Sequence, residues 1–94
     1  MLVTNEIVSI TISVPYQKGN EIVNQIVPFK VFRQQQYYRA IPLISAEERN
    51  IAGLSTELSF RFIENRIIPE ADTNEANLNA INNIAGELRI LRIV

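Results

Sequence analysis

Apolar and polar residues alternate strictly over residues 8–14, where four aliphatic residues are separated by serine and threonine. An alternation with a period of two, in β-branched residues, is typical of a β-strand that buries one face. Pro15 ends the alternation, and Gly19 supplies a residue that can adopt a positive φ in the turn that follows. The pattern therefore predicts a first strand over residues 8–14 and a turn soon after it.

A second apolar segment, residues 22–33, contains Pro28 near its centre. Proline has no N–H to donate to a neighbouring strand, so this segment is predicted to lie at an edge of the sheet or to carry a bulge at Pro28. The glutamines at 34–36 are predicted to form a polar connection. Further strands are expected over residues 37–44, 58–63 and 66–68, the last two joined by a tight turn at Glu64 and Asn65.

A short helix is predicted after the third strand. Ser45 and Glu48 have the spacing of a capping box, in which each side chain satisfies a free main-chain amide at the helix start. Gly53 follows at the position where a left-handed residue would end such a helix. These residues predict a helix over about 46–52.

A longer helix is predicted near the C-terminus. Asp72 is a good N-cap, and apolar residues recur at spacings of three and four from Leu78 onward, which is the pattern of an amphipathic helix. The apolar stripe includes Leu88, but beyond Gly86 the residues Ile90, Ile93 and Val94 fall off it. Arg92 falls on the stripe, and glycine is common just after a helix end. The sequence therefore favours a helix over about 73–85 that breaks at Gly86 before a final strand. A helix that continues through residues 87–94 remains the alternative.

Together these elements predict a single α+β domain over residues 1–94. The expected architecture is a mainly antiparallel sheet of about five strands, with the short helix and the C-terminal amphipathic helix packed on one face. A chain of 94 residues is long enough for one such domain with a modest core of its own.

Composition narrows the chemistry that the chain can perform. Histidine, cysteine and tryptophan are absent, which removes imidazole catalysis, thiolate chemistry, disulfides and zinc sites of the usual kinds. The three glycines are isolated, so neither glycine-rich nucleotide-binding motif is present. The acidic cluster over residues 70–75 lacks the central glycine and the distal glutamate of a calcium loop. We therefore predict no metal site and no cofactor.

Charge and hydropathy bear on the partners and the location of the protein. Nine basic and ten acidic residues give a net charge of −1, so no global field draws the chain to a polyanion or an anionic membrane. The first residues lack the basic and apolar regions of a secretory signal, and no apolar run reaches the ~18–20 residues of a membrane span. The expectation is a cytoplasmic protein without membrane contact.

Aromatic and basic residues are interleaved over residues 29–39, and Arg61 lies between two phenylalanines in a later strand. Aromatic side chains on a sheet, with cations beside them, are what single-strand nucleic-acid binders use to stack bases and attract the backbone. The same pattern is typical of core aromatics with solvent-facing neighbours, and the near-neutral charge favours that interpretation. The candidate residues for nucleic-acid binding are Phe29, Lys30, Phe32, Arg33, Tyr37, Tyr38 and Arg39.

The segment 88–94 contains five large aliphatic residues among its seven. So much apolar surface must be buried in the fold or against a partner, and pairing of identical subunits is the commonest way to bury it in a chain of this size. We therefore expect a homodimer. Its interface is predicted to include Leu88, Ile90, Leu91, Ile93 and Val94.

These observations favour a small, non-enzymatic module for protein interaction or regulation that acts as a homodimer. Two alternatives remain open. One is single-stranded nucleic-acid binding through the aromatic and basic sheet residues, and the other is an enzyme with a carboxylate- or tyrosine-based site at a dimer interface. The candidate carboxylates for that site are Glu47, Glu48, Glu64 and Glu70.

Overall fold

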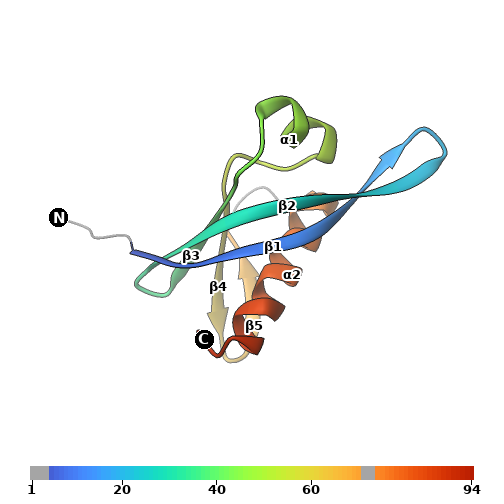
Figure 1. The fold of residues 1–94 in the computed structure, drawn as a ribbon. Coiled ribbons are helices and arrows are strands. Elements are labelled where there is room, and N and C mark those ends of the chain that lie inside the picture. The colour runs from blue at the N-terminus through green and yellow to red at the C-terminus, as the bar shows by residue number, and fades with distance from the viewer. Residues whose placement is uncertain (1–4, 71–73) are drawn as a thin grey trace.

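The computed structural model describes residues 5–70 and 74–94 of the chain. These residues form, in chain order, β1 (Asn5–Lys18), β2 (Glu21–Gln34), β3 (Tyr37–Pro42), α1 (Ala46–Ala52), β4 (Leu58–Ile63), β5 (Arg66–Pro69) and α2 (Glu75–Ile90). The five strands pair antiparallel in the order β1-β2-β3-β4-β5, and the two helices pack against the sheet (Figure 1). This architecture confirms the predicted α+β fold. Neither α1 nor α2, the helices of the described ranges, is long and apolar enough to cross a membrane.

β1 and β2 form one long hairpin, whose register runs without interruption from Val8 to Lys18, up to a turn at Gly19 with a φ of 63°. β3 pairs only with residues 29–34 of β2. The distal part of the hairpin therefore has no third strand and projects beyond the rest of the sheet as a two-stranded ribbon (Figure 1). The first strand is longer at both ends than the predicted segment 8–14.

β2 lies between β1 and β3, so the prediction that Pro28 marks an edge strand or a bulge is wrong. The register places Pro28 opposite Leu43, one residue beyond the end of β3, and the N–H of Leu43 donates to the carbonyl oxygen of Pro28 at 2.8 Å. The nitrogen and the carbonyl of a strand residue point to the same side. The missing N–H of Pro28 therefore faces the place where β3 has already ended, and the β1–β2 pairing is unaffected.

The core lies between α2 and one face of the sheet, which we call the inner face. Alternate residues of the strands are buried at the inner face, and their neighbours lie on the opposite, outer face. The largest fully buried side chains are Phe29, Phe60, Leu58, Ile81, Ile84, Leu88, Val14, Val27, Val31 and Asn77. Full burial of an aliphatic or aromatic side chain contributes about 1.5–3 kcal/mol, so the contact between α2 and the sheet is the main source of stability for the helix.

The N-cap that the sequence predicted for α1 is present, but the capping box is incomplete, because Glu48 accepts the hydroxyl of Ser45 and not its main-chain N–H. The N–H of Glu48 donates to Oγ of Ser45 at 3.1 Å, and that hydroxyl donates to Oε1 of Glu48 at 3.0 Å. At the other end, Gly53 has a φ of 75°, and the N–H of Leu54 donates to the carbonyl oxygen of Arg49 at 3.0 Å. α1 therefore begins and ends where the sequence predicted.

α2 does not break at Gly86 but continues to Ile90, so the predicted break and final strand are wrong. Leu88 lies four residues beyond Ile84 and is fully buried, which extends the apolar stripe past the glycine. A glycine in a helix interior costs about 1 kcal/mol relative to alanine. Burial of the Leu88 side chain contributes about 1.5–3 kcal/mol, which outweighs that cost.

The helix ends instead in a Schellman motif at Arg92, which has a left-handed φ of 58°. The N–H of Arg92 donates to the carbonyl oxygen of Arg89 at 3.1 Å. The N–H of Ile93 donates to the carbonyl oxygen of Leu88 at 3.0 Å, and Ile93 packs against the core as the hydrophobic residue of the motif. Ile93 is therefore part of the end of the helix rather than of a separate strand.

The start of α2 also differs from the prediction. The helix begins at Glu75, and its N-cap is Asn74, whose Oδ1 accepts the N–H of Asn77 at 2.7 Å. The predicted cap, Asp72, lies outside the described residues. The observed helix is thus shifted toward the C-terminus from the predicted range of about 73–85.

Replacing Gly86 with alanine is expected to raise the free energy of unfolding by about 1 kcal/mol and the melting temperature by about 4–8 °C. A Cβ atom at this position meets no other atom within 4 Å, so the gain carries no steric cost. The control is Gly53→Ala, which is expected to be destabilising because the φ of Gly53 is 75°. Thermal unfolding followed by circular dichroism measures both variants. A lower melting temperature for Gly86→Ala would contradict a helix that is continuous through residue 86.

Candidate interaction surfaces

The five residues predicted to form a dimer interface divide between the core and the surface. Leu88 is fully buried, and Ile93 is partly buried against the core. Ile90, Leu91 and Val94 expose 74%, 50% and 47% of their surface. These three residues, which we call the C-terminal aliphatic surface, are the part of the predicted interface that is open to a partner.

The residues predicted for nucleic-acid binding lie on both faces of the sheet, because neighbouring residues in a strand point to opposite sides. Phe29 and Tyr38 are buried on the inner face, and the guanidinium of Arg33 lies over the ring of Tyr38, 5.5 Å from its centroid. The remaining candidates, which lie on the outer face, are Lys30, Phe32, Tyr37 and Arg39. The structure therefore brings only part of the predicted set together.

On the outer face, two basic side chains are paired with carboxylates. Nη1 of Arg39 lies 3.2 Å from Oε1 of Glu57, and Arg61 forms an ion pair with Glu70. The guanidinium of Arg61 also lies over the ring of Tyr37, 5.2 Å from its centroid. Because ion pairing reduces the positive potential that attracts a phosphate backbone, this face gives little support to nucleic-acid binding.

The carboxylates considered for an enzyme site lie on separate elements. Glu47 and Glu48 are exposed in the first turn of α1, where the helix dipole stabilises acidic groups. Glu64 lies in the β4–β5 turn with a φ of 50°, and Glu70 is paired with Arg61. Within residues 5–70 and 74–94, no three acidic side chains gather closely enough to hold a metal ion.

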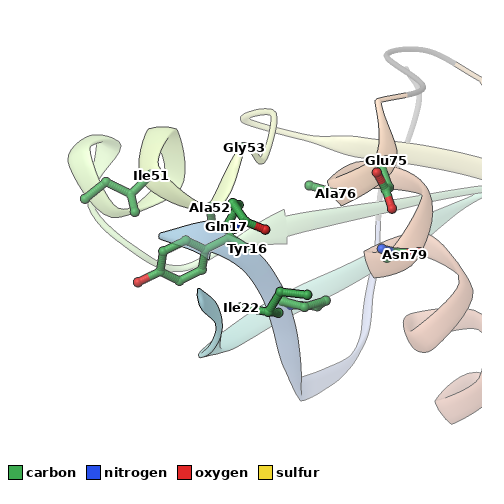
Figure 2. Close-up of a pocket in the computed structure, with 10 residues that line it drawn as sticks. Tyr16, Gln17, Ile22, Ile51, Ala52, Gly53, Glu75, Ala76 and Asn79 are labelled. Carbon is green, nitrogen blue, oxygen red and sulfur yellow. The ribbon is translucent and has the colours of Figure 1, made fainter. Parts of the chain in front are cut away.

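A groove of about 470 Å³ opens between the distal part of the β1–β2 hairpin, the end of α1 and the start of α2 (Figure 2). Ile51 of α1 and Glu75 of α2 lie on opposite sides of it, and Ile22 of the hairpin lies between them. Most of its lining is apolar, and within residues 5–70 and 74–94 Glu75 is the one carboxylate that lines it. The groove can therefore hold an apolar side chain, but the described residues do not bring together there the two carboxylates that paired acid–base chemistry requires.

One buried polar residue, Asn77, is not singled out by the sequence pattern, yet it is fully buried. Its Oδ1 accepts the N–H of Ser55 at 3.0 Å, and its Nδ2 donates to Oγ of Ser55 at 2.9 Å. Nδ2 of Asn74 donates to the carbonyl oxygen of Gly53 at 2.9 Å. These bonds fasten the start of α2 to the loop after α1. The signal available in the sequence is the position of Asn77, four residues before Ile81 on the buried stripe of the helix.

A second, smaller groove of about 300 Å³ lies between β1 and α2. It is lined by Thr11, Ile12 and Ser13 of β1 and by Asn83 and Glu87 of α2. The alternation of the first segment predicted a strand there, but not that the strand lies at an edge of the sheet beside a helix. The position of a strand in the sheet depends on which strands pair with it, and the alternation of apolar and polar residues within one strand does not identify those partners.

Comparisons of the chain with protein-family models, with curated proteins and with solved structures found no match. The features from which a function can be argued are therefore the surfaces described above. Among them, the C-terminal aliphatic surface carries the most exposed large aliphatic side chain of the described residues, that of Ile90.

Proposed function

We propose that the protein is a non-enzymatic interaction module that acts as a homodimer. The observation that supports this proposal is the C-terminal aliphatic surface, where Ile90, Leu91 and Val94 are exposed at the end of α2. Neighbouring exposed aliphatic side chains are typical of surfaces that a partner covers. Because the net charge of the chain is −1, a second copy meets little electrostatic repulsion.

The size of this surface sets a limit on what it can do alone. Full burial of one aliphatic side chain contributes about 1.5–3 kcal/mol, whereas association costs about 4–15 kcal/mol. Stable interfaces bury about 800 Å² on each partner, which is more than three side chains provide. A stable homodimer therefore needs a second contact surface in the same interface.

The proposed function is tested by light scattering on the whole chain at tens of micromolar. The expected result is a mass of twice the 10.7 kDa of one chain. A monomer mass at this concentration would overturn the proposed function.

Replacing Ile90 with lysine is expected to shift the protein to the monomer, because a charged side chain then has to be buried at the interface. The fold tolerates this change, since Ile90 is 74% exposed and a cation in the last turn of a helix is favourable. The matched control is Asn50→Lys, which places the same charge at an exposed position in the last turn of α1. Light scattering is expected to show a monomer for the first variant and a dimer for the second. Dimers of equal stability in both variants would contradict a contact at Ile90.

A further inference from the structure

β1 is an edge strand, and no strand of the described ranges pairs with its outer side. Thr11 is opposite Pro28, whose carbonyl oxygen is directed toward β3 and accepts a hydrogen bond there. Residues opposite one another in an antiparallel pair direct their main-chain groups either toward each other or both away, so Thr11 directs its N–H and C=O away from β2. Ser9 and Ser13, two positions away on either side, do the same. The outer side of β1 thus presents a row of main-chain donors and acceptors.

This edge lacks the features that usually prevent edge strands from pairing. Proteins protect such edges with charged residues, prolines or bulges. Residues 8–14 contain none of these, whereas the irregularity in register lies just before Val8 and a proline follows at position 15. The bulge and the proline therefore border this segment and do not lie within it.

The sequence of this segment is a palindrome centred on Thr11, because Val-Ser-Ile-Thr-Ile-Ser-Val is the same from either end. Two such strands can pair antiparallel around a two-fold axis at Thr11. Ser9 then faces Ser13 of the second copy on the outer face of the sheet. Ile10 faces Ile12 of the second copy on the inner face. Hydroxyl pairs and pairs of β-branched residues are both favourable across antiparallel strands.

The helix beside this edge also favours a second copy. Asn83 and Glu87 line the groove of about 300 Å³ between β1 and α2. Ile90 lies on the same side of α2 as these residues, seven positions after the first and three after the second. On that side Gly86 also leaves open space, since a Cβ atom there meets nothing within 4 Å. One side of α2 thus connects the β1 edge with the C-terminal aliphatic surface.

We propose that the homodimer forms by antiparallel pairing of β1 with β1 of a second copy around a two-fold axis at Thr11, so that the two sheets become one. This inference rests on the proposed function and names the second contact surface that the dimer needs. A second copy is favoured because, around a two-fold axis at Thr11, every residue of the palindrome faces a residue of its own type. Main-chain hydrogen bonds from Ser9, Thr11 and Ser13 supply the pairing, as in other cases of strand addition.

The register is tested with single cysteines, which is direct because the sequence contains no cysteine. In the proposed pair, the two Cα atoms at position 11 are about 5.5 Å apart, a separation that a disulfide spans. Ser13 faces Ser9 of the second copy, so the two residues at position 13 are four residues out of register and about 13 Å apart. Oxidation of Thr11→Cys is therefore expected to give a covalent dimer on a non-reducing gel about a hundredfold faster than oxidation of Ser13→Cys. Both positions are exposed on the same face of β1, which makes the second variant a matched control.

The outcomes separate this inference from the proposed function. Equal rates of cross-linking for the two variants, or no cross-linking of Thr11→Cys, would place the axis elsewhere and overturn the inference. If cross-linking overturns the inference but the unmodified chain is a dimer by light scattering, the proposed function still stands. If the unmodified chain is a monomer, both proposals fail.

Charge substitution at the axis gives an independent readout. Thr11→Lys and Thr11→Glu are each expected to be monomeric, because like charges would face each other directly across the axis. A mixture of the two variants is expected to recover a heterodimer, because opposite charges then face each other. Asn24→Lys and Asn24→Glu, exposed on the same hairpin but outside the palindrome, are expected to remain dimeric alone. Dimers of each Thr11 variant alone, or a mixture that stays monomeric, would contradict an axis at Thr11.

Discussion

Replacing Leu88 with alanine is expected to lower the free energy of unfolding by about 2–5 kcal/mol. Leu88 is fully buried between α2 and the sheet, so its truncation leaves a cavity that the core fills only in part. Equilibrium unfolding in urea measures the change. The measurement is made at a protein concentration low enough to keep the chain monomeric, because association would add to the apparent stability.

The control for this prediction lies two residues away. Ile90 is 74% exposed, so Ile90→Ala is expected to change the free energy of unfolding by no more than about 0.5 kcal/mol. Truncation of an aliphatic side chain to alanine is thus expected to have a large effect on the buried side of this helical turn and a small effect on the exposed side. Similar losses for the two variants would contradict the helical phase of α2 beyond Gly86.

Replacing Asn77 with alanine is expected to cost about 1–3 kcal/mol, because its two hydrogen bonds to Ser55 are lost from a part-buried site. The N–H and the hydroxyl of Ser55 both lose their hydrogen bonds to the Asn77 amide, at 3.0 and 2.9 Å. The loss occurs even though alanine is the better helix former. Equilibrium urea unfolding, again with the monomer, measures this change.

Asn82→Ala is the matched control for that prediction. Asn82 is exposed on the same helix, so its replacement is expected to raise stability by a few tenths of a kcal/mol through helix propensity alone. Opposite signs for the two asparagine variants are the expected outcome. A stabilising effect of Asn77→Ala would show that the hydrogen bonds to Ser55 contribute less than helix propensity.

The short helix α1 could be predicted to the residue because all of its determinants are local. Ser45 and Glu48 bond to each other within the first turn, and Gly53 ends the helix through its own φ of 75°. The turn between β4 and β5 at Glu64 and Asn65 is also local, and both residues have the positive φ of a tight turn. Each of these features involves residues only a few positions apart.

The end of α2 could not be predicted in the same way. Gly86 is a local signal for a helix end, with a cost of about 1 kcal/mol inside a helix. The competing contribution is the burial of Leu88 against strands that are distant in sequence. That contribution is larger, but it depends on where the sheet lies and so cannot be obtained from the spacing around Gly86 alone.

For the candidate surfaces, too, part of the outcome follows from the local sequence and part from contacts between distant segments. The alternation of Phe29 with Lys30 was sufficient to place these two residues on opposite faces. Which face α2 covers was not determined by the alternation, and it is this contact that buries Phe29 and leaves Lys30 exposed. The predicted C-terminal interface was likewise reduced to Ile90, Leu91 and Val94, because Leu88 and Ile93 pack within their own chain.

By itself, the sequence determined the order and type of the elements from β1 to α2, though not the end of α2, because alternation, capping and turn formation act over a few residues. It also contains the palindrome over residues 8–14, although a palindrome has consequences for pairing only when its strand is at an edge. Only the tertiary structure decided that β1 is that edge, that Pro28 lies in an interior strand and that Asn77 is buried. These outcomes depend on which distant segments meet. The free energy of those contacts, about 1.5–3 kcal/mol for each buried side chain, exceeds the local preferences of about 1 kcal/mol that the sequence pattern reports.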